Sequence, residues 1–334
     1  MRVRSFAIAV GLGALVASTP IHAASITVEA GASIQAALDA AAPGDTVAVM
    51  AGTFAEDLDF RGKAVAVVGR GPASVLLGTG LGPVVRFASN EGAESVLDSF
   101  TITGGAAPAG GGILIENASP TILRNVVTGN RASGQGSGVA VRGTGATPPS
   151  PLIANNLLSY NTNLDGIGDP HTIQVVNATP VIVNNTIVEG DSNGILLSGG
   201  ASAATVIMNN VIALNGTARE GRGRGICDFS GGAVIQWNVF HRNTVAALLT
   251  RTGRNYRRVR AAEREIGDPN LAFNSDRSPR FQDARRGDFR LRAKSPARNG
   301  GNPDPAFANR DGSRNTVGHT GGPLADLVAG RCRS

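Results

Sequence analysis

Charged and polar residues recur at fixed distances before four short aliphatic segments in the middle of the chain. We align the segments on one hydrophobic residue of each, namely Val139, Ile173, Ile195 and Ile226. This alignment produces two columns of side chains, the first with Gln135, Asp169, Asp191 and Arg222, and the second with Ser137, His171, Asn193 and Arg224. If the segments are parallel strands on successive coils, Asp169 and Asp191 lie about 5 Å apart. Carboxylates that close repel unless a cation, an arginine or a shared proton relieves them.

Such a cluster could abstract a proton from the carbon beside a uronate carboxylate. A carboxylate or the imidazole would act as the base, and arginine would neutralise the carboxylate of the substrate. The candidate catalytic residues are Asp169, His171 and Asp191, and the candidate substrate-binding residues are Arg222, Arg224, Asn193 and Gln135. Asp169 and Asp191 are also candidate ligands for Ca²⁺. The alternative is an Asp-Pro turn with a surface histidine and solvated charges.

The elements that would position these residues are repeats of 25 to 31 residues, each centred on an asparagine within an aliphatic block. The central asparagines are Asn125, Asn156, Asn185, Asn210 and Asn238, and a second asparagine follows five positions later at Asn130, Asn161, Asn215 and Asn243. Strands this short cannot bury a face alone, so we expect them to stack as coils. Stacking places equivalent amides above one another, where they satisfy each other as a ladder.

The composition supports a thin core built from small and branched side chains. The 334 residues include 45 glycines, and only 4% are aromatic. The interior of a coil accepts Val, Ile, Leu and Ala, and its corners need positive φ angles that glycine adopts. Near the start of the mature chain, Ile34, Ala37 and Leu38 share one face at helical spacing after Ser33, which predicts a capping helix with Ser33 as its N-cap.

Residues 33–54, the segment Val65-Ala66-Val67-Val68-Gly69 and the asparagine-centred coils together resemble the secreted parallel β-helix proteins of the pectin lyase-like superfamily. The ending, from Gly287-Asp288-Phe289 to Gly318, is similar to the closing segment of many bacterial β-helix-repeat proteins. The resemblance implies an all-β, right-handed parallel β-helix with a short N-terminal capping helix and an irregular C-terminal segment. This fold hosts lyases, hydrolases, epimerases and adhesins, so it leaves the activity open.

One local segment resembles a particular activity of this fold. Asp169-Pro170-His171 is similar to the Asp-Pro-His segment of mannuronan C5-epimerases, although Gly166 and Thr172 stand where those enzymes carry a tyrosine and an acid. The motifs of polygalacturonases and of pectin methylesterases are absent from the sequence. We therefore expect a protein that binds or processes an acidic polysaccharide, by lyase or epimerase chemistry if it is an enzyme. The alternative is a non-catalytic surface, adhesion or periplasmic structural module.

The first residues predict export. Arg2 and Arg4 precede an apolar run too short to span a bilayer, and Ala23 follows a small-residue region, as in a secretory signal of residues 1–23. We expect a periplasmic or secreted monomer with no lipid anchor and no membrane span. Cys227 and Cys332 could form one disulfide in that compartment or remain separate thiols.

The net charge of +6 divides unevenly along the chain. Residues 24–250, the expected cap and coils, carry 11 basic and 16 acidic groups, whereas residues 251–334, the expected insertion and closing segment, carry 18 and 9. Six arginines fall within residues 251–264. They could bind an acidic polysaccharide or a cell-surface polyanion, or form a solvated insertion. For an exported protein we do not expect a nucleic-acid partner.

Overall fold

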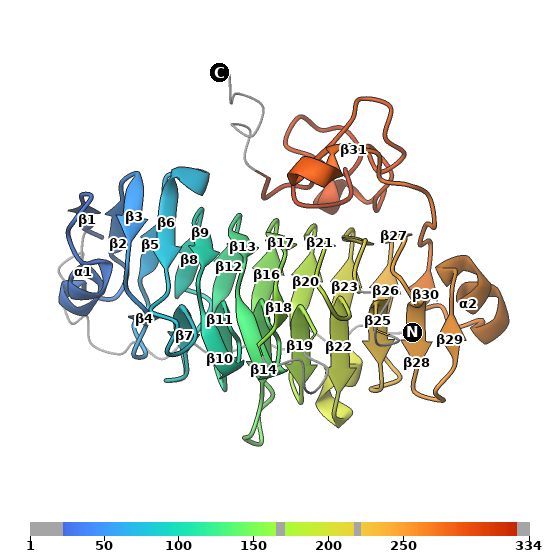
Figure 1. Cartoon of the computed structure of the whole chain (residues 1–334), viewed down its shortest axis with the longest axis horizontal. Coiled ribbons are helices and arrows are strands. Elements are labelled where there is room, and N and C mark those ends of the chain that lie inside the picture. Colours follow the sequence, from blue (N-terminus) through green and yellow to red (C-terminus); the bar gives the residue numbers. More distant parts are fainter. Residues whose placement is uncertain (1–22, 165–170, 217–221, 326–334) are drawn as a thin grey trace, which may run out of the picture.

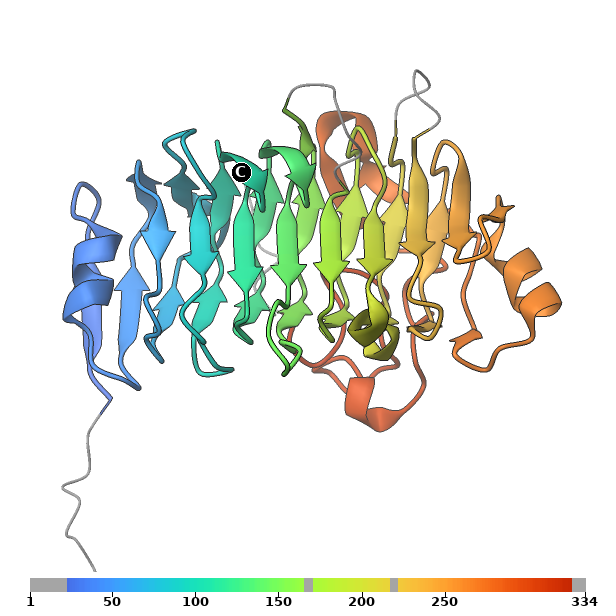
Figure 2. The same ribbon diagram turned by 90° about the horizontal axis from the view of Figure 1, so that it is seen from below.

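The chain winds around one long axis, and each coil adds a strand to each of three parallel sheets (Figure 1). The computed structural model describes residues 23–164, 171–216 and 222–325. Seen from below, equivalent strands of successive coils lie side by side along the axis (Figure 2). The fold is the expected right-handed parallel β-helix.

Sheet 1 contains the strands that come first in each coil. They are β1 (Ser25–Val28), β2 (Thr46–Val49), β5 (Ala66–Val68), β8 (Val96–Asp98), β12 (Thr121–Leu123), β16 (Leu152–Ala154), β20 (Val181–Val183), β23 (Val206–Met208), β26 (Val234–Gln236) and β30 (Leu271–Ala272). Sheet 2 follows it across a tight turn. Its strands are β3 (Gly52–Phe54), β6 (Ser74–Leu77), β9 (Thr101–Thr103), β13 (Val126–Thr128), β17 (Leu157–Ser159), β21 (Thr186–Val188), β24 (Val211–Ala213) and β27 (Val239–His241).

Sheet 3 closes each coil. Its strands are β4 (Leu58–Asp59), β7 (Val85–Phe87), β11 (Ile113–Glu116), β15 (Val139–Arg142), β19 (Ile173–Val176), β22 (Ile195–Ser198), β25 (Arg224–Asp228), β28 (Ala246–Thr250) and the antiparallel β29 (Asn255–Tyr256). A small side sheet joins β10 (Ala106–Ala109), β14 (Arg131–Gln135) and β18 (Thr162–Asn163). Four short 3₁₀ turns lie at Gly71–Ala73, Gly200–Ala204, Ala284–Arg286 and Pro305–Phe307.

The core is a set of aliphatic columns inside the coils. On sheet 1, for example, Ile122 pairs in register with Ile153, which pairs with Ile182, and all three are fully buried. Aromatic rings fill part of the core of the N-terminal coils, where Phe60 and Phe87 pack with centroids 4.2 Å apart. Each coil thus buries its apolar face against its neighbours rather than against a separate layer.

The predicted asparagine ladder is confirmed at the turn between sheets 1 and 2. Each buried side-chain amide donates a hydrogen bond to the asparagine of the next coil. For example, Nδ2 of Asn156 donates to Oδ1 of Asn185 at 3.0 Å, and Nδ2 of Asn185 donates to Oδ1 of Asn210 at 3.1 Å. The same oxygens accept backbone N–H groups, such as that of Asn156 at 2.9 Å. The ladder runs one coil further than the sequence repeat suggested, to Asn274, whose amide donates to Glu263.

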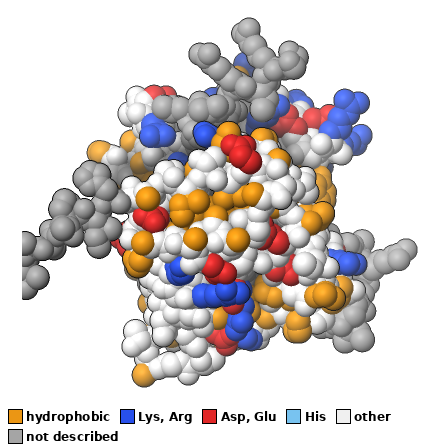
Figure 3. Space-filling view, turned by 90° about the vertical axis from the view of Figure 1, so that its left-hand side faces the viewer, with side chains coloured by type: hydrophobic (Ala, Val, Ile, Leu, Met, Phe, Trp, Pro, Cys, Tyr) orange, Lys and Arg blue, Asp and Glu red, His pale blue; other side chains and the backbone are white. Residues whose placement is uncertain are grey.

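Helices cover both ends of the stack. The predicted capping helix is α1 (Ile34–Ala40), with Ser33 Oγ accepting the N–H of Ala36 at 3.1 Å, and it buries Ile34 and Leu38 against the first coils. Figure 3 views this end, where acidic and basic side chains are interspersed with apolar ones. Helix α2 (Val259–Ile266) covers the other end and ends at Gly267, which adopts φ 66°. Neither of the two α-helices in the described segments has the length and apolar composition that spanning a bilayer requires.

After the last coil, residues 276–325 turn back along the outside of sheet 2, and we call them the C-terminal strap (Figure 1). The strap contains the hairpin β31 (Phe281–Asp283) and β32 (Asp288–Leu291). Its Phe281, Phe289 and Val317 form an apolar cluster with outward-facing Val188 and Val211 of sheet 2. The strap therefore buries apolar side chains that would otherwise face water on this sheet.

Polar contacts fix the strap to the turn between sheets 1 and 2. Three of them use outward asparagines of successive coils. Asn155 Nδ2 donates to His319 O at 3.0 Å, and Asn184 Nδ2 donates to Thr316 O at 2.8 Å. Asn209 Oδ1 accepts the N–H of Asn302 at 2.9 Å. His319 is half-buried, with Nδ1 2.9 Å from Thr186 Oγ1. Burial lowers the pKa of His319 to about 4.

We expect the substitution Asn185→Ala to destabilise the protein by about 3 kcal/mol, because buried groups such as the N–H of Asn156 and the carbonyl of Ile153 lose their partner. Urea unfolding followed by circular dichroism measures this free energy. The matched control is Asn270→Ala, whose exposed side chain makes no hydrogen bond within the described part of the chain. Equal losses in both variants would contradict the ladder as a stabilising element.

The strap should loosen in acid. Because the folded pKa of His319 lies below the unfolded value of about 6.5, its contribution is complete above pH 6.5 and falls, by on the order of 3 kcal/mol, as pH drops toward about 4. Asp288 stays ionised in this range because Arg290 holds its pKa below the usual value. Trp237, the single tryptophan, lies 5.2 Å from the Arg314 guanidinium of the strap, so its fluorescence reports the release.

The matched variant for this measurement is His319→Gln, which keeps a polar side chain but has no proton to gain. We expect its tryptophan emission to lose the pH dependence between about 6.5 and 4. Persistence of the full pH response in this variant would show that another group controls the strap.

Candidate functional site

The alignment that defines the two polar columns agrees with the strand register of sheet 3. Val139 pairs with Ile173, Ile173 with Ile195, and Ile195 with Ile226, all on parallel neighbours. The residues that precede these strands therefore lie on successive coils. We call this line, which follows the turn from sheet 2 into sheet 3, the polar edge; it comprises Gln135, Ser137, His171, Asp191, Asn193, Arg222 and Arg224.

His171 lies in the second column but is not at the surface, because only 4% of the residue is exposed. Its Nε2 is 3.3 Å from Nδ2 of the fully buried Asn193. Oδ1 of Asn193 accepts the N–H groups of Gly223 at 3.0 Å and Arg224 at 2.7 Å, which orients the amide so that Nδ2 donates to His171. The imidazole nitrogen Nε2 is thus an acceptor already in use, and this contact positions the coil rather than a substrate.

Asp191 is half-buried at the end of the coil before β22. Its two carboxylate oxygens accept the N–H of Asn163, at 3.1 and 3.0 Å. Asp169, its predicted neighbour, lies outside the described residues, so the carboxylate pair and the Ca²⁺ site remain predictions. Within the described ranges, no three His, Cys, Asp or Glu side chains converge as a metal site.

The basic members of the polar edge are Arg222 and Arg224, and Arg224 contacts the end of the solenoid. Arg222 and Arg224 are half-buried, and Arg224 Nε donates to Oδ1 of Asn255 in β29 at 2.7 Å. Gln135 ends β14 in the side sheet, with its carbonyl accepting the N–H of Gly110 at 2.8 Å. It therefore lies on the polar edge but three coils from Arg224.

The next coil adds basic residues that the sequence alignment missed. Arg224 pairs in register with Ala246 of β28. His241 ends β27 on the same coil, and Arg242 follows it in the turn that leads to β28. Arg257, which follows β29, lines the same hollow of about 130 Å³ as these two residues. Arg242 occupies the turn position before Asn243, the last asparagine of the second series, and this position could have marked it as an outward side chain.

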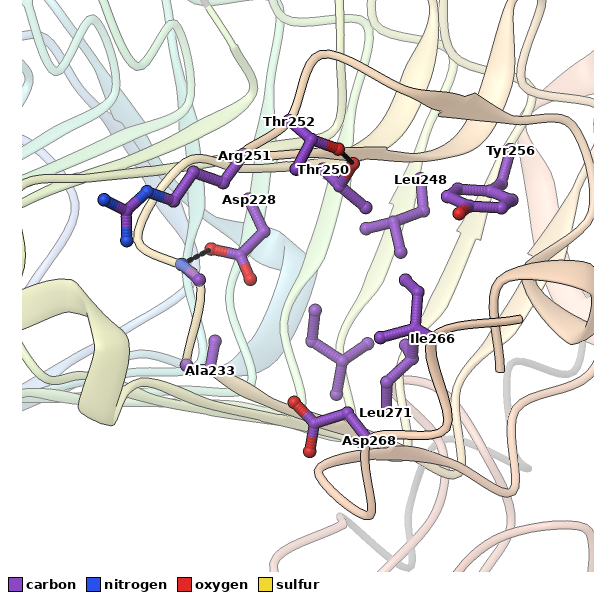
Figure 4. A pocket seen from close by; sticks show the side chains of 13 residues that line it. Asp228, Ala233, Leu248, Thr250, Arg251, Thr252, Tyr256, Ile266, Asp268 and Leu271 are labelled. Carbon is purple, nitrogen blue, oxygen red and sulfur yellow. Dashed lines mark hydrogen bonds between the residues drawn. The ribbon is translucent and has the colours of Figure 1, made fainter. Parts of the chain in front are cut away.

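A second hollow, of about 260 Å³, lies between β28 and α2 (Figure 4). Leu248, Ile266 and Leu271 form its apolar wall, and Asp228 and Asp268 point toward it from the rim (Figure 4). Oδ1 of Asp228 is occupied by Ser230 and Gly231 within a local turn. Cys227 is buried on the same strand as Asp228, while its predicted partner Cys332 lies outside the described residues.

Comparisons with solved structures return alginate lyases. The alginate lyase AlyGC, of the PL6 family, is 16% identical, with 65% of this chain and 32% of that enzyme covered at a TM-score of 0.39, so the match spans about a third of its length. An alginate lyase from Paenibacillus sp. strain FPU-7 is 15% identical, with 68% and 91% covered at a TM-score of 0.32. A search of curated proteins gave no match.

A sequence model of one protein family matches residues 85–261, the stretch that forms the coils from β7 to the start of α2 and includes the polar edge. The match covers more than half of the 334 residues. The chain therefore belongs to the family described as periplasmic copper-binding protein (NosD).

Proposed function

We propose that this protein binds an acidic polysaccharide outside the cytoplasm, with the basic end of the polar edge as the contact surface. The observation that carries the proposal is a group of four arginines at one edge of the solenoid. Arg222, Arg224 and Arg242 lie on two successive coils, and Arg257 directly follows the hairpin strand β29. Arginine side chains bind carboxylates through paired, charge-assisted hydrogen bonds, and an array of them suits a repeating anion. The predicted signal of residues 1–23 and the periplasmic family both support an exported location.

The family description names copper, which raises the question of whether this chain has side chains that could ligate it. The imidazoles of His171 and His319 are engaged by Asn193 and Thr186, and the sulfur of Met208 lies 3.3 Å from the amide of Asn302. His, Cys, Asp and Glu do not form a group of three anywhere in the described segments. These donors do not fit a copper centre, which favours clustered imidazole and sulfur ligands. The proposal therefore takes no step through copper.

Cleavage or epimerisation of the polysaccharide would be a catalytic activity in addition to binding at the same edge. It would depend on Asp169, His171 and Asp191 as the candidate catalytic residues. The structure supports a positioning role for His171, because its Nε2 accepts the Asn193 amide and the residue is buried. Asp191 is the more accessible of the two described candidates. We therefore confine the proposal to binding and use two experiments to separate binding from turnover.

The double substitution Arg222→Gln and Arg224→Gln should weaken binding to polygalacturonate or alginate roughly tenfold, because two charges of the contact surface are lost. Affinity should also fall as salt is raised. Isothermal titration calorimetry measures both effects, with neutral dextran as the ligand control and Arg285→Gln, an exposed arginine of the strap, as the matched protein control. Failure of the unsubstituted protein to bind any acidic glycan would overturn the proposal.

His171→Ala should lower the melting temperature, since the buried amide of Asn193 loses its acceptor at a cost of about 1–3 kcal/mol. His171→Gln retains an acceptor and should recover part of that loss. Both variants should bind the polysaccharide as the parent does once folded. If His171→Ala keeps the parent melting temperature but abolishes release of unsaturated uronate, measured by ultraviolet absorbance, His171 is catalytic rather than structural.

A further inference from the structure

The hollow beside His241 is lined by basic side chains. It has a volume of about 130 Å³ and is lined by His241, Arg242 and Arg257 together with Phe240, Asn243 and Thr244. This is the room of roughly four water molecules, which admits one small charged group but not a sugar ring. Among the described residues, no aspartate or glutamate lines it.

Two separate parts of the chain supply the arginines. Arg242 occupies the outward position of the turn from sheet 2 into sheet 3, with φ 52°, the same left-handed position that Tyr160, Glu189 and Leu214 hold on earlier coils. Arg257 arrives from the other side, directly after the hairpin strand β29, which pairs with β28. Because the left-handed position recurs on these coils, it belongs to the repeat, and it leaves the Arg242 side chain exposed at the turn.

No residue in the described part of the chain neutralises the positive charge of the hollow. Neither guanidinium makes an ion pair or a side-chain hydrogen bond within the part of the chain that the structure describes. The pKa of His241 is lowered, first by burial and second by the charge of Arg242. No carboxylate contributes to this shift. A positive cavity of this kind attracts a counter-ion, because an anion there gains two strong partners without breaking an existing ion pair.

We propose that this hollow binds one oxyanion group, a carboxylate, sulfate or phosphate, with Arg242 and Arg257 as charge-assisted donors and His241 as a third donor. Planar guanidinium groups offer paired N–H donors that match two oxygens of such a group. The group can belong to a free ion or to an acidic polysaccharide. The second source rests on the proposed function, and there the hollow holds the carboxylate of one sugar at the end of the polar edge.

The test follows the ring signals of His241 in the full chain by nuclear magnetic resonance during titration with sulfate, phosphate and acetate, at constant ionic strength against chloride. We expect a saturable shift of His241 and a rise in its pKa of about one unit, because the bound anion stabilises the imidazolium. His171 and His319, which lie away from this hollow, serve as internal references. A response equal to that in chloride would overturn the proposal.

Variants assign the site. Arg242→Gln and Arg257→Gln should each weaken oxyanion binding about tenfold, whereas Arg258→Gln, an exposed neighbour with the same change of charge, should not. An equal loss in all three variants would indicate a diffuse field and overturn the site. Tryptophan emission from Trp237 checks that each variant is folded. Arg257→Gln also tests the site without a substitution at Arg242, which has the left-handed backbone conformation.

A titration with an oligouronate distinguishes a free oxyanion from a polysaccharide carboxylate as the occupant of the hollow. It also tests the oxyanion site separately from the proposed binding of polysaccharide. If the oligouronate shifts His241 and competes with sulfate, the polysaccharide carboxylate occupies the hollow. If free oxyanions bind but no acidic glycan does, the proposed function fails and the oxyanion site stands. If an acidic glycan binds and the Arg222→Gln and Arg224→Gln double substitution weakens it, while no oxyanion shifts His241, the proposed function stands and this inference is wrong.

Discussion

The asparagine ladder is the contact on which the rest of the structure depends. Each amide accepts and donates between coils, so the turn from sheet 1 into sheet 2 is fixed at the same height in every coil from Asn125 to Asn274. Because the inward polar groups satisfy one another in a buried interior, each coil of this stretch presents an asparagine there, and the strands stay in register. The interior is therefore repetitive along this stretch, whereas the side chains that face outward vary in charge and polarity.

The outward-facing side chains have different roles at the two turns of the coil. At the turn between sheets 1 and 2, Asn155, Asn184 and Asn209 bind the backbone of the strap, and the chain covers its own sheet 2. At the turn between sheets 2 and 3, the equivalent outward position changes along the axis from Tyr160 to Arg242. One edge of the solenoid is thus occupied by the protein itself, whereas the other carries the arginines to which we assign binding.

The balance of basic and acidic side chains also changes along the axis of the solenoid. Near the N-terminal cap, basic side chains are paired, as in Arg61 with Asp39 at 2.8 Å, and further along the solenoid Arg142 pairs with Glu116 at 3.1 Å. Past β24 arginines become more numerous than carboxylates, and Arg242 and Arg257 reach the surface without an ion pair in the described segments. An uneven field along the axis orients a long anion better than a uniform net charge does.

The sequence by itself determined the coil repeat, the ladder, the helix α1 and the pairing of Ile173 with Ile195, because each coil uses the same local pattern and stacking equivalent residues follows from it. Only the tertiary structure decided that His171 is buried beside Asn193, that the strap covers sheet 2 and that Arg257 joins Arg242. These contacts join residues outside the repeat or side chains whose burial depends on neighbouring coils. No periodic pattern specifies them, because they arise from packing between segments that share no period.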